Sequence, residues 1–417
     1  MTKLDAPRQT GHRFPQFLPD GRHFLFYAAG STEGAGICLA SLDGGEPKRL
    51  TAADTAGVFL KPDRIVYMRQ GTLVARRLDL GRGELAADSI TVADQVGYDS
   101  STYAGGFSVS PSGRVAYRTG GAGTSQLTWF DQTGKTVGVL GEPDSSGLHY
   151  PEFSPDGRRV AVARSVQNNQ DIFLMDRVRG NFTRFTFDAK PDVNPVWSRD
   201  GAQIAFTSSR TGLFNIYTKP SNMAGDETLL LESPVTKVVQ DWSKDFLLYY
   251  DVNPKTGRDL WALDMSGKDH QPRVVANTPF EETMAQFSPD GRWVAYQTNE
   301  SNRFEIVVQA FPEPKGKWQV STGGGVEPRW RADGKALYFI SPDGKLMTAT
   351  VTPVGTVLEP GTPTMLFATR IVGGGTIATN RPEYAVRDGQ FLINQTVGTA
   401  TLAPITILLN WDPDLKK

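Results

Sequence analysis

A short phrase that recurs along the whole chain constrains the fold more than any other feature. FSPDGRRVAVARS at residues 153–165 returns as FSPDGRWVAYQT at residues 287–298. Related phrases, in which an aromatic or aliphatic residue precedes an Asp, Asp-Gly or, at residue 109, Ser-Gly turn, begin at residues 17, 60, 109, 153, 197, 242, 287, 330 and 385. The intervals run from 43 to 55 residues, so nine repeat units fill the chain.

Each unit contains four short runs of alternating apolar residues, separated by polar turns. In the fourth unit the second run is 159–163, the third is 171–175 and the fourth is 182–186. Short alternating runs rich in β-branched and aromatic residues predict antiparallel strands. Each unit therefore predicts one four-stranded meander.

Meanders of this kind bury both faces when they are set radially around an axis, as in a β-propeller. A repeat of roughly 40 to 45 residues is typical of propeller blades. We therefore expect an all-β fold, a single β-propeller over residues 1–417 with four-stranded antiparallel blades. Nine phrases imply nine blades, whereas the usual range ends near eight, so eight and nine both stay open. The units are expected to start near residues 14, 57, 105, 150, 194, 238, 284, 327 and 382.

The Ser-Pro-Asp-Gly phrase itself is expected to form a turn between the first and second strands. Gly supplies a positive φ and Pro presets its own φ. A phosphate-binding loop is the alternative, but such a loop leads into a helix N-terminus, whereas this phrase leads into a strand. The aromatic residues before the turn are expected to be buried between neighbouring blades: Phe17, Phe153, Trp197, Trp242, Phe287 and Trp330.

The charge balance argues against a nucleic-acid partner. Lys plus Arg number 44 and Asp plus Glu number 45, so the concentrated positive field that phosphate backbones require is not indicated. The single cysteine, Cys38, is expected to be a small core residue. The first residues lack the apolar run of a signal peptide, and no stretch reaches the length of a membrane span. We expect no membrane insertion by this chain.

Motifs for the common catalytic chemistries are missing from the sequence. Neither Gly-x-Ser-x-Gly, His-Glu-x-x-His, Cys-x-x-Cys nor the set of protein-kinase motifs occurs. We therefore expect no enzyme activity, no catalytic residue, no cofactor and no metal site. Two acidic patterns have alternatives. Residues 251–259 begin like a calcium loop but place Lys255 at a ligand position, which favours a polar hairpin. Glu281 and Glu282 are either acid–base or cation-binding carboxylates, or solvated loop charges.

The repeated phrase, with Asn-Pro-Val-Trp-Ser at 194–198, resembles the WD-repeat-like propeller of TolB-type proteins over essentially the whole chain. A narrower resemblance rests on LTWFDQTGK (127–135), RFTFDAKPDVNPVWS (184–198), KWQVSTGGGVEPRWRADGK (317–335), SPDGKLM (341–347) and the C-terminal APITILLNWDPDLKK. These phrases are similar to the C-terminal propeller of bacterial transmembrane serine/threonine protein kinases. That resemblance implies a sensor or scaffold in a periplasmic or other extracytoplasmic location, although kinase domain and membrane span are both missing here.

Three functions stay open at this point. The first is a non-catalytic binding or sensor module for a small ligand or a protein partner. The second is a propeller enzyme, a lyase or glycosidase, with a site in the axial channel, and the third is a TolB-like periplasmic scaffold. Titratable groups clustered at one channel mouth would favour the enzyme.

A ligand site, if present, is expected where the chain enters the first strand of each blade, because those loops line one mouth of the channel. The alternative is that these residues only solvate the mouth and satisfy strand ends. The residues expected there are His12, Arg13, Tyr103, His149, Tyr150, Asn194, Gln240, Asp241, Glu281, Glu282, Glu327, Arg329 and Arg381.

The two ends of the chain give a further expectation. The ninth unit offers three strands, and residues 1–13, which are polar and contain Pro7, are a poor strand to complete it. The chain is therefore expected to be a fragment of a longer array. The run 405–409 is expected to form an exposed edge that favours self-association.

Overall fold

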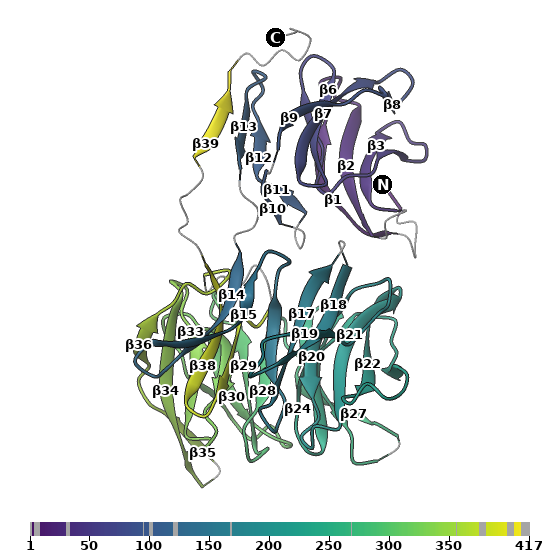
Figure 1. Ribbon diagram of the computed structural model, residues 1–417. Helices are drawn as coiled ribbons and strands as arrows, with labels where there is room; N and C mark the ends of the chain where they lie inside the picture. The colour runs from purple at the N-terminus through teal and green to yellow at the C-terminus, as the bar shows by residue number, and fades with distance from the viewer. Residues whose placement is uncertain are drawn as a thin grey trace. The chain divides into compact units, whose positions relative to one another are not determined.

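The computed structural model describes residues 2–3, 9–30, 34–94, 96–99, 103–119, 124–166, 169–267, 269–355, 357–374, 381–397 and 404–409. Within these ranges the regular structure is entirely β-strand, which confirms the all-β prediction. Figure 1 shows the strands coloured along the chain. None of the described residues forms a helix with the length and apolar sequence required to cross a bilayer.

The described chain separates into two compact units. Unit 1 comprises residues 1–123 and 398–417, and unit 2 comprises residues 124–397. The repeat phrase occurs in both units. Repeat spacing indicates turns and strands, but it does not indicate which sheets join one another. The predicted single ring of eight or nine blades is therefore not confirmed.

Unit 2 contains six antiparallel sheets among its described residues. Four follow the chain order, namely β16–β19, β20–β23, β24–β27 and β28–β31. In the fifth, β32–β36, both β35 and β36 pair with β34, and the sixth has the order β15-β14-β38-β37. The strands of the sixth sheet are β14 (Ser125–Phe130), β15 (Thr136–Asp144), β37 (Tyr384–Arg387) and β38 (Gln390–Thr396). The other strands are β16 (His149–Phe153), β17 (Arg159–Val166), β18 (Asn169–Asp176), β19 (Phe182–Arg184), β20 (Asp192–Trp197), β21 (Gln203–Thr211), β22 (Leu213–Pro220), β23 (Thr228–Leu231), β24 (Lys237–Trp242), β25 (Phe246–Asn253), β26 (Gly257–Asp264), β27 (Pro272–Ala276), β28 (Glu282–Phe287), β29 (Trp293–Thr298), β30 (Glu305–Ala310), β31 (Lys317–Gln319), β32 (Val326–Trp330), β33 (Ala336–Ile340), β34 (Lys345–Val354), β35 (Val357–Pro360) and β36 (Thr364–Ala368).

These six sheets form a closed ring. The first strands contact one another in the cyclic order β16, β20, β24, β28, β32, β37 and back to β16. β14 pairs with β38 along its whole length, so the two ends of unit 2 meet in one sheet, as Figure 1 shows. Separate apolar clusters fill the six interfaces between neighbouring sheets. Unit 2 is therefore a β-propeller of six blades, closed by strands from both of its ends.

The repeated turn has the predicted structure. In the turn after β16, the Ser154 hydroxyl donates to Asp156 Oδ1 at 2.6 Å and accepts from the Arg159 backbone N–H at 2.9 Å. Gly157 has φ 71°, where a side chain would be strained. The same serine-to-aspartate bond recurs at Ser198 and Ser288, each in the turn between the first and second strands of its blade. The phrase is thus a structural device that joins the first two strands of a blade.

Unit 1 stacks three larger sheets with apolar clusters between them and adds a two-stranded ribbon. The sheets are β1–β4, then β5–β9, then β12, β13 and β39, and the ribbon is β10 with β11. Its strands are β1 (Gln9–Phe17), β2 (His23–Gly30), β3 (Gly36–Ser41), β4 (Lys48–Thr51), β5 (Val58–Leu60), β6 (Arg64–Arg69), β7 (Thr72–Asp79), β8 (Glu84–Leu85), β9 (Ile90–Ala93), β10 (Tyr98–Asp99), β11 (Ala104–Gly105), β12 (Phe107–Val109), β13 (Val115–Arg118) and β39 (Ile405–Leu408).

Three expectations about this part of the chain need correction. Residues 9–13 are strand: they form the first part of β1 and pair with β2. β39 pairs with β13 of unit 1 and does not complete the ninth repeat, whose strands β37 and β38 instead join β14 and β15. Phe17 is 59% exposed, and its ring contacts Phe24 of β2 in its own sheet. Cys38 is buried, as expected, whereas Pro7 and Asn410 lie outside the described residues.

Candidate functional site

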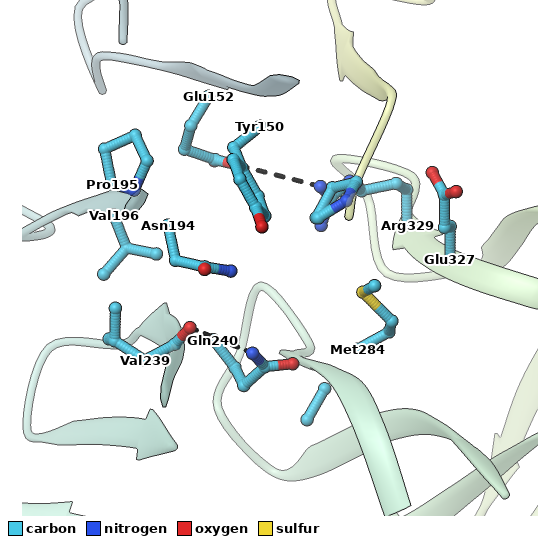
Figure 2. A pocket seen from close by; sticks show the side chains of 12 residues that line it. Tyr150, Glu152, Asn194, Pro195, Val196, Val239, Gln240, Met284, Glu327 and Arg329 are labelled. Atoms are coloured by element: carbon cyan, nitrogen blue, oxygen red, sulfur yellow. Dashed lines mark hydrogen bonds and ion pairs between the residues drawn. The ribbon is translucent and has the colours of Figure 1, made fainter. Parts of the chain in front are cut away.

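The axis of the unit 2 ring contains a pocket lined by first-strand residues. Its cavity volume is about 20 Å³, within about 400 Å³ of space between the lining atoms that includes open solvent. Figure 2 shows the side chains around it. The lining residues are Tyr150, Glu152, Asn194, Pro195, Val196, Val239, Gln240, Met284, Ala285, Glu327, Arg329 and Pro382.

A bulge in the first strands shapes this pocket. Tyr150, Asn194, Met284 and Glu327 all have positive φ, between 53° and 58°. Each follows a break in the pairing of its first strand with the second strand of the same blade. Bulges re-aim side chains, and non-glycine residues with positive φ persist only where their surroundings hold them. The four residues therefore turn toward the axis at equivalent points of four blades.

Neighbouring structure holds the bulges in place. The Tyr150 N–H donates to the Pro382 carbonyl at 2.9 Å, and the Glu327 N–H donates to Gln297 Oε1 at 3.1 Å. The Tyr384 hydroxyl donates to the Glu327 carbonyl at 2.8 Å. These bonds satisfy backbone groups that the bulge removes from the strand ladder.

One cation and one carboxylate face each other across the pocket. Arg329 Nη2 lies 3.9 Å from Glu152 Oε2, an ion-pair distance that is too long for a hydrogen bond. Figure 2 marks this pair. The Glu152 side chain retains 30% of its surface toward the pocket, yet it lies deep in the ring. Burial raises the pKa of Glu152 to about 7; Asp241 also raises it, while Arg329 opposes the shift.

The other carboxylates near the axis are occupied by backbone donors. Asp241 accepts from the backbone N–H groups of Trp242 and Phe287, both at 2.8 Å. Glu327 Oε2 accepts from the Glu383 N–H at 2.8 Å, and burial raises the pKa of Glu327 to about 8. Of the acidic groups around the pocket, Glu152 is the one whose carboxylate has no hydrogen bond to another described residue.

The structure brings five of the thirteen predicted site residues into the pocket. They are Tyr150, Asn194, Gln240, Glu327 and Arg329. Two more lie close by: Asp241 follows Gln240 on β24, and Arg381 precedes Pro382 and contacts the Tyr150 hydroxyl.

The remaining six residues lie elsewhere. His149 Nδ1 is 2.6 Å from Glu383 Oε1, which makes it a link between blades. Glu281 accepts from Arg258 at 2.8 Å. Glu282 is 1% exposed and accepts from the Thr278 hydroxyl; burial raises its pKa to about 7. His12, Arg13 and Tyr103 belong to unit 1, where Arg13 packs over the Tyr103 ring at 5.2 Å.

Sequence reasoning missed Glu152, which lies two residues beyond the expected entry point. A signal for it exists. The phrases Tyr-Pro-Glu-Phe at 150–153 and Glu-Pro-Arg-Trp at 327–330 place Glu152 and Arg329 at the same position of their repeats, and in Asn-Pro-Val-Trp at 194–197 that position holds Val196. One repeat has an acidic residue at this position, another has a basic residue, and a third has an apolar residue. This pattern indicates that the two charged side chains form a pair that faces the axis.

Comparisons with known proteins agree with this architecture. Residues 108–245 match the family model of the TolB beta propeller domain. Tol-Pal system protein TolB from one strain of Helicobacter pylori is 28% identical over 148 residues, 34% of this chain and 35% of that protein. The same protein from a second strain is 26% identical over 158 residues, 37% of each. The chain therefore aligns with about a third of the length of these curated relatives.

The structural comparison supports the same fold. A putative TolB from Agrobacterium tumefaciens superposes with a TM-score of 0.54 at 17% identity, over 67% of this chain and 100% of that one. The fold defines a β-propeller protein with an axial pocket. More particularly, the propeller is similar to that of TolB-type proteins.

Proposed function

We propose that this chain is a non-catalytic, TolB-like scaffold that binds a protein partner by taking a polar segment of it into the axial pocket. The observation that carries the proposal is the convergence of hydrogen-bonding side chains from separate blades on one pocket. Asn194 comes from β20, Gln240 from β24 and Arg329 from β32. Pockets with a few convergent polar groups are the usual binding sites of a fold.

The arrangement of carboxylates favours binding over catalysis. Titratable groups do gather near the axis, as a lyase or glycosidase would require. A glycosidase, however, needs two carboxyl groups that both face the substrate. Asp241 and Glu327 are engaged by backbone N–H groups, which leaves Glu152 as the free one. A single free carboxyl group is suited to binding a ligand or to controlling its access to the pocket.

The relatives suggest the kind of partner. The similar proteins from Helicobacter pylori are named for the Tol-Pal system. We therefore propose an extracytoplasmic location and a protein partner from an assembly of that kind. The finer interpretation, a sensor propeller of a receptor serine/threonine kinase, draws its support from the sequence phrases at 127–135, 184–198 and 317–335 and uses the same pocket.

Site-specific photocrosslinking in the native host tests this proposal. A photoreactive phenylalanine replaces Gln240 at the pocket, and a control replaces Val178, which is 94% exposed in the turn after β18. The proposal predicts that position 240 crosslinks to one discrete protein and that position 178 does not. A crosslink that is absent at 240, or that is the same at both positions, contradicts it.

A further inference from the structure

Arg329 is a buried cation with unused hydrogen-bonding capacity. Its side chain is 10% exposed, and its Nε–H donates to the Tyr384 carbonyl at 3.2 Å. The terminal N–H groups of the guanidinium donate to no other described residue, and Nη2 reaches Glu152 only at ion-pair distance. The terminal N–H groups open onto the pocket, where a ligand can supply the acceptor that the described residues do not.

We propose that Arg329 anchors the ligand through a carboxylate group, which takes the place of Glu152 beside the guanidinium. The planar fork of arginine matches a carboxylate with two parallel N–H···O bonds, a fit that lysine cannot give. This inference rests on the proposed function, since it names the group that the bound segment presents to the pocket.

Glu152 acts as the gate of this anchor. The charged groups that influence it are Arg329 from β32 and Asp241 from β24. Asp241 keeps its two backbone bonds, so Glu152 is the carboxyl group beside Arg329 that is free to exchange partners. When Glu152 is ionised it repels an incoming carboxylate and competes for Arg329. When it is protonated it frees the guanidinium and offers an O–H donor.

The other charged groups near Arg329 are held by contacts of their own and do not gate it. Glu327 is directed to the Glu383 N–H, His149 is held by Glu383, and Arg381 lies beside Tyr150. The pKa of Glu152 is raised to about 7, mainly by burial, so the carboxylate ligand is bound more tightly below pH 7 than above it.

The free carboxylate has two sources, the C-terminus of a polypeptide and a small organic acid. Three probes distinguish them: acetate, N-acetyl-trialanine with a free carboxylate, and the same tripeptide as a C-terminal amide. Binding to the full chain is followed by calorimetry and by the Arg329 Nε–H signal of protein labelled with ¹⁵N-arginine. That signal is assigned by its loss in Arg329→Lys.

The expected result is binding of the free-acid tripeptide but not of the amide, about tenfold tighter at pH 6 than at pH 8, as expected when one protonation gates binding. Arg329→Lys is expected to weaken binding about tenfold or more, since one bidentate charge-assisted bond pair is lost. Tighter binding of the tripeptide than of acetate assigns a polypeptide C-terminus, and equal binding assigns a small acid.

Glu152→Gln keeps the shape of the side chain and mimics its protonated form. It is expected to lose most of the pH dependence of binding to the free-acid probe, with the remainder set by Glu327, whose pKa is about 8. This variant keeps the test valid even if an Arg329 variant fails to fold. Equal binding of acid and amide probes, or an Arg329 signal that does not move, overturns the inference. If neither acetate nor the free-acid tripeptide binds while position 240 still crosslinks to its partner, the proposed function stands and the role of Arg329 as a carboxylate anchor is wrong.

Discussion

His149 Nδ1 lies 2.6 Å from Glu383 Oε1, although the two residues are 234 positions apart in the chain. His149 begins β16, and Glu383 immediately precedes β37. The second oxygen of Glu383 accepts from Asn394 Nδ2 at 2.7 Å, and the Glu383 side chain is fully buried. The carboxylate therefore joins three segments at the point where the ring of unit 2 closes.

Replacement of Glu383 by leucine is expected to lower the free energy of unfolding by about 3 kcal/mol. The change leaves the half-buried His149 and one N–H of the buried Asn394 amide without an acceptor, while the other Asn394 N–H keeps the Leu148 carbonyl. Chemical denaturation of the full chain measures the effect. The control is Glu142→Gln at an exposed position, for which a change below about 0.5 kcal/mol is expected. Equal effects of the two substitutions would show that the link contributes nothing to closure.

Trp197→Ala is expected to cost on the order of 3 to 5 kcal/mol, as large-to-small core substitutions do. The ring is 5% exposed, its Nε1–H donates to the Glu152 carbonyl of the preceding blade, and the Arg159 guanidinium stacks on it at 4.8 Å. Phe187→Ala is the matched control, because that ring is 63% exposed. A loss for Trp197→Ala as small as that of the control would refute the alignment of repeats.

The sequence predicted the blade interior well because each repeat carries its own turn and its own buried aromatic. Phe153, Trp197, Phe287 and Trp330 are all buried, as expected from their position before the Asp-Gly turn. Trp242 is only half-buried. The prediction fails for Phe17, which is exposed. Local turn chemistry and apolar alternation carry this information within one unit.

Ring closure could not be predicted, because it depends on pairing between distant strands. The sequence predicts residues 125–130 and residues 390–396 as strands of two separate repeats. In the structure these two strands pair with each other in one sheet. Similar repeats occur on both sides of the boundary at residue 124, so their spacing carries no sign of it. The pocket was partly predictable from the entry points of the first strands. Glu152 was missed because the bulge at Tyr150 shifts which residues face the axis.

The protonation of Glu327 makes stability depend on pH. Burial raises the pKa of Glu327 from 4.5 in the unfolded chain to about 8, so the folded state retains a proton that the unfolded state releases. The contribution of Glu327 to stability is complete below pH 4.5 and is lost as pH rises through 8, by up to about 1.4 kcal/mol per pH unit. Glu327→Gln, which keeps an acceptor for the Glu383 N–H, is expected to flatten the decline between pH 5 and pH 8. Parallel pH profiles of the two proteins would contradict the raised pKa.

The edge of β39 is expected to support self-association. β39 pairs with β13 on one side, and Ile405 and Ile407 on one of its faces are 69% and 57% exposed. Exposed apolar edge strands pair with other chains unless a charge interrupts them. Sedimentation at increasing concentration should show association of the wild type and a clear reduction in Ile407→Lys. Unchanged sedimentation relative to a Val178→Lys control would exclude this edge as the contact.

The central claim is that a partner protein enters the axial pocket. Hydrogen–deuterium exchange of the full chain, with and without the partner identified by crosslinking, tests this claim most directly. If the partner enters the axial pocket, protection should be confined to the backbone that leads into β16, β20, β24 and β32, with the outer strands β19, β23 and β27 unchanged. Protection of the outer strands, with no change around Tyr150, Asn194 and Gln240, would place the partner on another surface and contradict the account.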